Sequence, residues 1–392
     1  MADAVSQETL FGVRASEQVT GNLLNSNGRK PTGVLPAQEV KALVRDKSII
    51  ALESIEQDQY QPSSLDLRLG SKAYRIRASF LPGNKRTVED ALNLVFMHEI
   101  DLSEGAVLET GCVYLVPLME RLALPQRVSG AANPKSSTGR LDVFTRLITD
   151  EANAFDRIKQ GYKGPLYAEI SPKTFSIFVR AGSRLNQLRL RRGTPRFVDA
   201  NLKRLHEEIG LIDTQGDIDI DQGIALSIDL KGEAGSELVG YRAKRHAGMI
   251  DVDKLGAYDP MDYWERIYTR GNSTIVLDPD EFYILVSKEA VTVPPDHAAE
   301  MVPFNPLMGE FRVHYAGFFD PGFGYSEDGG AGSRAVLEVR SHDVPFILED
   351  GQIVGRLIYE RLTAKPDFIY GQDIGSHYQR QGLKLSKHFK TG

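Results

Sequence analysis

Two cations and two hydroxyls lie close together in the segment NPKSSTGRL, residues 133–141. Lys135, Ser136, Ser137 and Arg140 supply side-chain donors, and the backbone amides of the same run add more. Phosphate groups are bound by this combination of charged and neutral donors. The spacing therefore predicts a phosphate-binding turn, although an ordinary solvated turn fits these residues alone equally well.

Two glutamates stand on segments that are otherwise apolar. Glu169 ends the run DRIKQGYKGPLYAE, and Glu338 lies near the end of FFDPGFGYSEDGGAGSRAVLEV. A carboxylate on such a strand is costly to bury, so it either faces solvent or is kept as a base with a shifted pKa. An outward-facing Glu is the commoner outcome for one strand. The presence of Glu at the same point of both segments favours the catalytic interpretation.

The C-terminal segment IYGQDIGSHYQRQGLKLSKHF combines aromatic residues with Gln, His and Lys. A frayed terminus is the usual interpretation of such a stretch. Tyr370, Tyr378 and Gln381 nevertheless suit a tail that orders over a ligand and excludes water from it.

Composition narrows the classes of function. One cysteine and eight histidines occur without Cys-x-x-Cys or His-Glu-x-x-His spacing, so we expect no built-in catalytic zinc. The formal charge of -6 argues against a dedicated nucleic-acid binder, which needs a basic surface. No apolar run approaches the roughly 18 residues that span a bilayer, and the single cysteine fits a reducing cytoplasm.

An internal repeat is the strongest organisational signal. LETGCVYLVPLMERLALP begins at Leu108 and LDPDEFYILVSKEAVTVP at Leu277, an offset of 277 − 108 = 169 residues. The same offset joins FVRAGSRLNQLRL to ILEDGQIVGRLIY, and Glu169 to Glu338. The repeat predicts a tandem duplication whose halves meet near residues 192–210.

Short apolar runs separated by Gly, Pro, Asn and Asp predict a mainly β protein. QPSSLDLRLG, residues 61–70, alternates like a half-buried strand with one apolar face. Two segments, PAQEVKALVRDKSI and NLKRLHEEIG, have helical spacing, and the second ends in a Gly cap. We predict a loose segment over 1–30, domains over 31–200 and 201–365, and a tail over 366–392 that closes over the site.

Several of these segments together resemble the dCTP deaminase family of the trimeric dUTPase-like superfamily. The matching motifs are the PSS-hydrophobe-DLRLG strand at 62–70, the Arg-Ser-Ser-x-x-Arg phosphate motif at 135–140, the Asp-Pro-Gly-aromatic turn at 320–323 followed by Leu-Glu at 337–338, and Tyr-x-x-Gln at 378–381. Ordinary members carry all of them on one shorter domain. In this chain the first half has the strand and the phosphate motif, and the second half has the turn, the Glu and the tail.

The resemblance implies two tandem dUTPase-like domains of the β-clip, distorted jelly-roll or barrel type, with a few short helices. It implies zinc-independent hydrolytic deamination of dCTP to dUTP and ammonia, in pyrimidine deoxynucleotide metabolism, with Glu as general base on the attacking water. Mg²⁺ is expected only with the triphosphate. A cytoplasmic homo-oligomer is expected, with a trimer favoured. The residues expected to bind nucleotide or phosphate are Lys135, Ser136, Ser137, Arg140, Arg157, Ala316, Asp320, Tyr370, Tyr378 and Gln381.

Two arrangements of the site stay open. In the composite one, Ser136, Ser137 and Arg140 face Glu338 and the hairpin at Ala316. In the other, the first domain is catalytic by itself through Arg157 and Glu169. Because RIKQGYKG also resembles the uracil hairpin of dUTP pyrophosphatases, a dUTPase or a bifunctional deaminase-pyrophosphatase is the alternative enzyme. A catalytically silent nucleotide-binding regulator is the non-enzymatic alternative.

Overall fold

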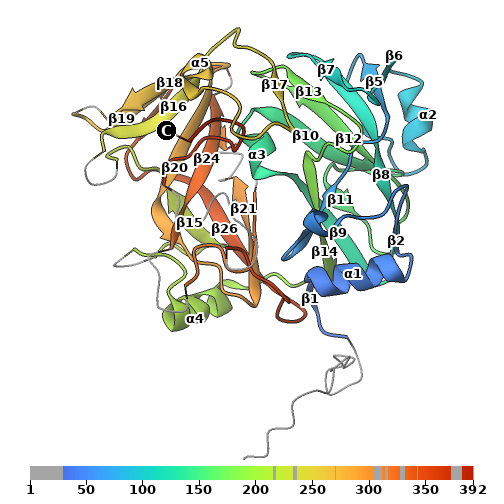
Figure 1. Ribbon diagram of the computed structural model, residues 1–392. Helices are drawn as coiled ribbons and strands as arrows, with labels where there is room; N and C mark the ends of the chain where they lie inside the picture. The colour runs from blue at the N-terminus through green and yellow to red at the C-terminus, as the bar shows by residue number, and fades with distance from the viewer. Residues whose placement is uncertain are drawn as a thin grey trace, which may run out of the picture. The chain divides into compact units, whose positions relative to one another are not determined.

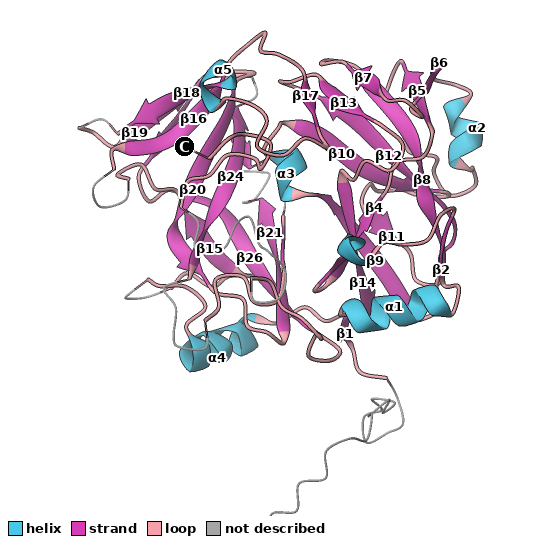
Figure 2. Ribbon diagram, in the orientation of Figure 1, coloured by secondary structure: helices cyan, strands magenta, loops and turns pink. Residues whose placement is uncertain are grey.

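Short strands make up most of the computed structural model (Figure 1). It describes residues 30–214, 218–232, 236–269, 271–303, 311–313, 317–326, 332–341, 343–371 and 382–391. The chain divides into two units, Met1–Pro31 and Thr32–Gly392, and the helices and strands belong to the second. The protein is mainly β, as predicted, and Figure 2 shows the strands in magenta with few helices in cyan.

Three sheets contain the strands of the first half, with one short strand added from the second. The first has the order β11-β9-β14-β4-β3, with β1 beside β14. The second has the order β10-β12-β8-β5-β6, with β2 beside β8, and the third has the order β17-β13-β7. Their bounds are β1 Gly33–Val34, β2 Ile49–Ala51, β3 Tyr60–Gln61, β4 Ser64–Leu67, β5 Lys72–Ile76, β6 Phe96–Asp101, β7 Ala106–Leu108, β8 Val113–Ala123, β9 Val128–Pro134, β10 Val143–Thr149, β11 Arg157–Ile158, β12 Lys163–Pro172, β13 Ile177–Val179, β14 Asn186–Arg192 and β17 Ile250–Asp251.

Three further sheets belong to the described residues of the second half. Their orders are β15-β26-β21-β23, β18-β16-β20-β24-β22 and β19-β25. Their bounds are β15 Ile224–Ser227, β16 Leu238–Ala243, β18 Trp264–Tyr268, β19 Thr274–Leu277, β20 Phe282–Val291, β21 His297–Pro303, β22 Phe311–Val313, β23 Phe318–Phe319, β24 Ser333–Ser341, β25 Phe346–Glu349 and β26 Ile353–Arg361.

Both predicted helices are confirmed. They form α1 (Ala37–Arg45) and α4 (Asp199–Ile209), and Gly210 ends α4 with a φ of 73°. A side chain at that φ would be strained, which is why Gly caps the helix there. The other helical elements are α2 (Val88–Leu92), α3 (Ser136–Gly139), α5 (Pro260–Tyr263) and the 3₁₀ turn η1 (Gln57–Gln59).

Strands recur at the offset found in the sequence. β8 and β20, β9 and β21, and β13 and β25 each begin 169 residues apart. A side-chain contact recurs as well, because the Tyr114 hydroxyl accepts from the Glu109 amide and the Tyr283 hydroxyl from the Asp278 amide, each at 3.0 Å. A tandem duplication would produce this pattern. The duplication and the predicted domain bounds stay predictions.

The expectation for QPSSLDLRLG is half right. Residues Ser64–Leu67 do form a strand, β4, but all four residues are buried and the strand lies between β14 and β3. The polar side chains are buried because they have partners: Arg68 Nε donates to Glu120 Oε1 at 2.8 Å, and both side chains are at most 4% exposed. The alternation of the sequence cannot distinguish such an internal pair from an exposed polar face.

One hydrophobic core crosses from the first half into the second. Trp264 of β18 is 1% exposed and packs edge-to-face against Phe175, with ring centroids 5.5 Å apart, and against Phe389 at 5.9 Å. The same cluster includes Leu190 of β14 and Ile284 of β20. Close-packed cores deform little, so the two halves are held in fixed geometry relative to each other.

Candidate active site

The predicted phosphate-binding turn is a short helical turn, α3, that follows β9. Lys135 precedes α3 in extended conformation, and its carbonyl accepts from the amides of Thr138 at 2.8 Å and Gly139 at 3.0 Å. Ser137 is 6% exposed and Arg140 is 3% exposed. Ser136 is exposed and Lys135 is partly exposed, so the turn is packed on one side and open to solvent on the other.

Arg140 lies against Glu338, the predicted general base of the second half. Its Nε is 3.8 Å from Oε1 of Glu338, and Glu338 is 5% exposed. Glu338 lies on β24, where it pairs with Ile284 of β20. The structure thus brings together two residues 198 positions apart (338 − 140), the ones that the composite arrangement requires to face each other.

Burial dominates the electrostatics of Glu338. Removal from water raises the pKa of this carboxyl from 4.5 to about 7, and the Arg140 guanidinium opposes the rise. A carboxyl with a pKa near neutrality is half ionised at the working pH of most enzymes, which suits a group that must both accept and return a proton.

A second contact holds the same two segments together. Arg340, two residues after Glu338 on β24, donates through Nη2 to Asp142 Oδ2 and, at 3.1 Å, to Thr174 Oγ1. Asp142 is 1% exposed and adopts a φ of 55° two residues after Arg140. We call Arg340, Asp142 and Thr174 the β24 clamp. It holds the segment that follows α3 against β24, two residues beyond each partner of the Arg140–Glu338 contact.

The Asp-Pro-Gly turn is held by the first half. Asp320 Oδ1 accepts a 2.6 Å hydrogen bond from Ser63 and lies 3.6 Å from Nη2 of Arg189. Burial raises the pKa of Asp320, against the opposing effect of Arg189. Arg189 is fully buried and also donates to the carbonyls of Ala299 at 2.8 Å and Phe319 at 3.2 Å.

Strand β4 supports the phosphate-binding turn on its other side. Lys135 donates to Asp66 Oδ2, and Ser64 Oγ donates to Gln187 Oε1 at 3.2 Å. Ser63, directly before β4, donates to Asp320, so the polar residues in and beside β4 contact both the phosphate-binding turn and the Asp-Pro-Gly turn. They form a framework around these two segments.

Tyr370 packs on the Asp-Pro-Gly turn. Its amide donates to the Pro321 carbonyl at 2.8 Å, and its ring lies 5.9 Å from that of Phe323. Gly322 has a φ of 94°, and a Cβ there would lie 2.9 Å from the Tyr370 carbonyl oxygen. Only glycine allows this approach. Ala316, Tyr378 and Gln381 lie outside the described residues.

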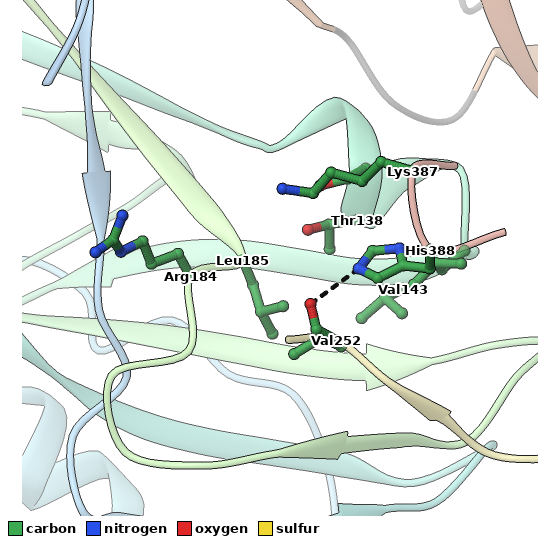
Figure 3. A pocket seen from close by; sticks show the side chains of 9 residues that line it. Thr138, Val143, Arg184, Leu185, Val252, Lys387 and His388 are labelled. Atoms are coloured by element: carbon green, nitrogen blue, oxygen red, sulfur yellow. Dashed lines mark hydrogen bonds between the residues drawn. The ribbon is translucent and has the colours of Figure 1, made fainter. Parts of the chain in front are cut away.

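The last described segment belongs to the predicted tail and contacts α3, through residues that the sequence did not single out. Arg140 Nη1 donates to the Lys384 carbonyl at 3.0 Å, and Ser386 Oγ donates to the Ser137 carbonyl at 2.8 Å. His388 contacts Ser386 through Nδ1 and the Val252 carbonyl through Nε2, and Figure 3 shows its ring directed at that carbonyl. Burial lowers the pKa of His388 to about 4, so the ring is neutral at pH 7.

A small cavity adjoins α3 at this point (Figure 3). Its lining includes Ser137, Thr138, Arg184, Lys387 and His388. Its volume of about 20 Å³ has room for about one water molecule, so it is not a nucleotide pocket in this conformation. Arg184 and Lys387 lie in no recognisable sequence motif. Their positive charge is the one sequence signal that could have suggested a position beside the phosphate-binding turn.

The alternative pair, Arg157 and Glu169, is not brought together in the same way. Arg157 lies exposed on β11, whereas Glu169 of β12 is 1% exposed. The cation on Glu169 is Arg146 of β10, whose Nε lies 3.1 Å from Oε1 and whose Nη2 contacts the same oxygen. Glu169 thus has a direct ionic partner in its own half, which the sequence did not identify.

No group of three or more His, Cys, Asp and Glu side chains arranged to hold a metal ion occurs in the part of the chain that the structure describes. Within those same residues, no helix has the length and apolar character needed to cross a bilayer.

Known proteins match both halves of the chain. A family model described as "2'-deoxycytidine 5'-triphosphate deaminase (DCD) N-terminal domain" matches residues 31–194, and one described as "2'-deoxycytidine 5'-triphosphate deaminase (DCD), C-terminal domain" matches residues 198–389. A crystal structure titled 2'-deoxycytidine 5'-triphosphate deaminase, from Agrobacterium tumefaciens, is 60% identical, with a TM-score of 0.81. The match covers 85% of this chain and 100% of that one.

Curated relatives add a statement about products. The "dCTP deaminase, dUMP-forming" of Pseudarthrobacter chlorophenolicus is 32% identical over 151 residues, which are 36% of this chain and 75% of the relative. The protein of the same name from Streptomyces avermitilis is 30% identical over 160 residues, 38% of this chain and 80% of the relative.

Proposed function

The chain belongs to the dCTP deaminase family, and from this premise we propose that it deaminates dCTP at a composite site between its two halves. The observation that carries the proposal is the 3.8 Å contact between Arg140, which follows the phosphate turn, and the buried Glu338. One segment offers phosphate ligands and the other offers a base. The two are adjacent within a single chain.

Glu338 is the general base of the proposed reaction. Cytosine C4 is a poor electrophile, so the attacking water must lose a proton as its oxygen bonds to C4. Glu338 takes that proton and returns it to the departing amino group, so that dCTP and water give a uracil nucleotide and ammonia. The raised pKa of Glu338, about 7, makes both transfers accessible near neutral pH.

We propose that Arg140 acts both at the pyrimidine, through Glu338, and at the phosphates of the substrate. Its position 3.8 Å from Glu338 stabilises the ionised carboxylate, and its place after α3 puts a cation beside the phosphate ligands Lys135, Ser136 and Ser137. Arg and hydroxyl donors together bind phosphate with charge-assisted hydrogen bonds. Asp320, held by Ser63 at 2.6 Å, and Tyr370 are proposed to contact the nucleoside.

The proposed reaction uses no zinc, and Mg²⁺ is expected only as counterion of the substrate triphosphate. Zinc deaminases activate water on a metal held by His and Cys ligands. This chain has a single cysteine, Cys112. We further propose a cytoplasmic homo-oligomer, with a trimer favoured.

The product needs its own test, because the curated relatives are named for dUMP formation. We propose dUTP as the product, and a bifunctional enzyme that goes on to dUMP and pyrophosphate is the second candidate. Hydrolysis at the α-phosphate is a separate step that follows or accompanies loss of ammonia. Both candidate enzymes therefore release ammonia, but only the bifunctional enzyme also releases pyrophosphate.

The experiment is a complete product balance. The full chain is incubated with dCTP and excess Mg²⁺, with and without a zinc-selective chelator, and ammonia, dUTP, dUMP and pyrophosphate are quantified. We expect one ammonia per dCTP consumed, dUTP without pyrophosphate, and no effect of the chelator. Equal amounts of pyrophosphate and ammonia would establish the bifunctional enzyme. Tight binding of dCTP without ammonia would establish the silent regulator and refute the proposal.

A further inference from the structure

The second glutamate occupies the same place in its sheet as Glu338. Glu169 of β12 pairs with Leu115 of β8, and Glu338 of β24 pairs with Ile284 of β20. Both residues of the second pair lie 169 positions after those of the first. The first half therefore contains a buried carboxylate equivalent to the proposed base, which the proposed reaction does not use.

A planar cation covers this second carboxylate. The Arg146 guanidinium donates to Glu169 Oε1 through two of its nitrogens and to Ser79 Oγ at 2.9 Å. Its central carbon lies 3.5 Å from the ring centroid of Phe155 and 4.7 Å from that of Phe144. A flat group is thus stacked on aromatic rings while its N–H edge faces a carboxylate.

Phe155, whose ring contacts the Arg146 guanidinium, aligns in the sequence with a different type of residue in the second half. Arg157 of β11 pairs with Ala131, and Phe318 of β23 pairs with Glu300, which is 169 positions after Ala131. Arg157 and Phe318 are therefore equivalent, and counting two residues back from each reaches Phe155 and Ala316 in the sequence. In the sequence, the first half thus has the bulky Phe155 at the position of Ala316, the small residue that the resemblance expects to contact the pyrimidine.

The contacts of Arg146 are those that an aminopyrimidine needs. A guanidinium is planar, stacks on aromatic faces and presents N–H donors in one plane. Cytosine is also planar and stacks, and its exocyclic amino group donates hydrogen bonds in the ring plane. The Oε2 atom of Glu169 is buried and has no hydrogen-bond partner among the described residues, so the carboxylate keeps one unused acceptor.

We propose that Arg146 fills a second cytosine-type base position, built on Glu169, Phe144, Phe155 and Ser79, and thereby closes it to nucleotides. The position would accept a planar amino-bearing heterocycle or cation once the Arg146 side chain is removed. This inference rests on the proposed role of Glu338, because the equivalence of the two glutamates is what identifies the position. It predicts one functional base site in each chain.

The test uses full-length Arg146→Ala with guanidinium ion and deoxycytidine as probes. The Arg146 side chain is 23% exposed and Glu169 only 2%, so its removal opens a solvent-accessible hollow with an uncompensated carboxylate. Millimolar guanidinium chloride should raise the Tm of Arg146→Ala by about 2–3 °C relative to equal sodium chloride. The wild-type protein should show no such rise. Equilibrium dialysis should find one more bound deoxycytidine per chain in Arg146→Ala than in the wild type.

Two further variants keep the result interpretable. Arg121→Ala, which removes an exposed cation from the neighbouring strand β8, should behave as wild type with both probes. Because loss of one partner of a buried ion pair can unfold a protein, the double variant Arg146→Ala/Glu169→Gln removes both charges. It should bind deoxycytidine and lose the response to guanidinium.

Absence of additional deoxycytidine binding in both Arg146→Ala and the double variant, with native circular dichroism, would overturn the proposal. This outcome is separate from failure of the proposed function. The readout is binding in the first half, whereas the proposed function is judged by ammonia release, which Arg146→Ala should retain within about twofold of the wild type.

Discussion

At the scale of the residue, the two glutamates differ in how closely a cation approaches the carboxylate. Both carboxylates are at most 5% exposed. Glu169 is in direct hydrogen-bond contact with Arg146, while Arg140 stays 3.8 Å from Glu338. Glu338 therefore keeps a pKa raised by desolvation to about 7, which is the property a general base needs.

The rate should depend on pH through this group. Glu338 must be ionised to accept a proton from water, so kcat/KM for dCTP should be low well below pH 7, rise through about pH 7 and level off above it. The profile of kcat/KM reports the free enzyme. Initial-rate measurements of ammonia release between pH 5 and pH 9 test this. A profile flat across pH 6 to 8 would contradict it.

Stability should show the opposite trend. Because the folded-state pKa of Glu338 is raised from 4.5 to about 7, the native state holds the proton more tightly than the unfolded chain. Wild-type stability therefore falls as pH rises through this range and is lowest above about pH 7. The Gln side chain of Glu338→Gln does not ionise, so its stability does not fall in this way. The free energy of unfolding of Glu338→Gln should exceed that of the wild type at pH 8 by roughly 2–3 kcal/mol.

Chemical denaturation of both proteins at pH 5 and pH 8 measures this difference. At pH 5 the native wild-type carboxyl is largely protonated, so the two proteins should unfold at similar denaturant concentrations. An equal gap at both pH values would contradict a raised pKa for Glu338.

At the scale of the element, the β24 clamp positions α3 against β24. Arg340 reaches Asp142 and Thr174 from the same strand that carries Glu338. We expect Arg340→Met to lower kcat/KM for dCTP about tenfold or more, because displacement of a catalytic group by about 1 Å is that costly. Arg334→Met on the same strand, whose partner is Asp229, is the matched control and should stay near wild type. An equal loss of kcat/KM in Arg340→Met and Arg334→Met would contradict a positioning role for Arg340.

Sequence reasoning identified elements well where the information is local. The helical spacing of α1 and the Gly cap of α4 involve neighbouring residues, and both were found. The sequence singled out the phosphate-binding turn and Glu338 because motif and repeat select particular residues, and their roles stay predictions. The β24 clamp was missed, since its pairing joins residues 198 positions apart and no alternation or spacing encodes a partner at that distance.

The same limit explains the incorrect half of the β4 prediction. An alternating strand predicts one polar face in water, but Arg68 and Asp66 turn to Glu120 and Lys135. Burial of a charged side chain depends on a compensating charge brought by tertiary structure. Only the fold supplies that charge, so the sequence could indicate unusual polarity but not its buried partners.

At the scale of the whole molecule, the unit Thr32–Gly392 contains both Arg140 and Glu338, the two residues of the proposed composite site. Arg189 and Arg191 of β14 donate to residues of the second half, among them Glu360 at 2.9 Å from Arg191 Nε. The Arg140–Glu338 contact is therefore intramolecular. Activity per chain should stay constant on dilution through any dissociation of an oligomer, followed by light scattering. Loss of activity in step with dissociation would mean that a second chain completes the site.

The central claim is that Glu338, facing Arg140, is the base and that Glu169 is not. Its most direct test is ammonia release from saturating dCTP by Glu338→Gln and Glu169→Gln, each verified as folded by circular dichroism. We predict that Glu338→Gln loses at least about a hundredfold in kcat, the scale of general-base catalysis, while Glu169→Gln retains most of the wild-type rate. A Glu169→Gln variant that is inactive beside an active Glu338→Gln would contradict the account.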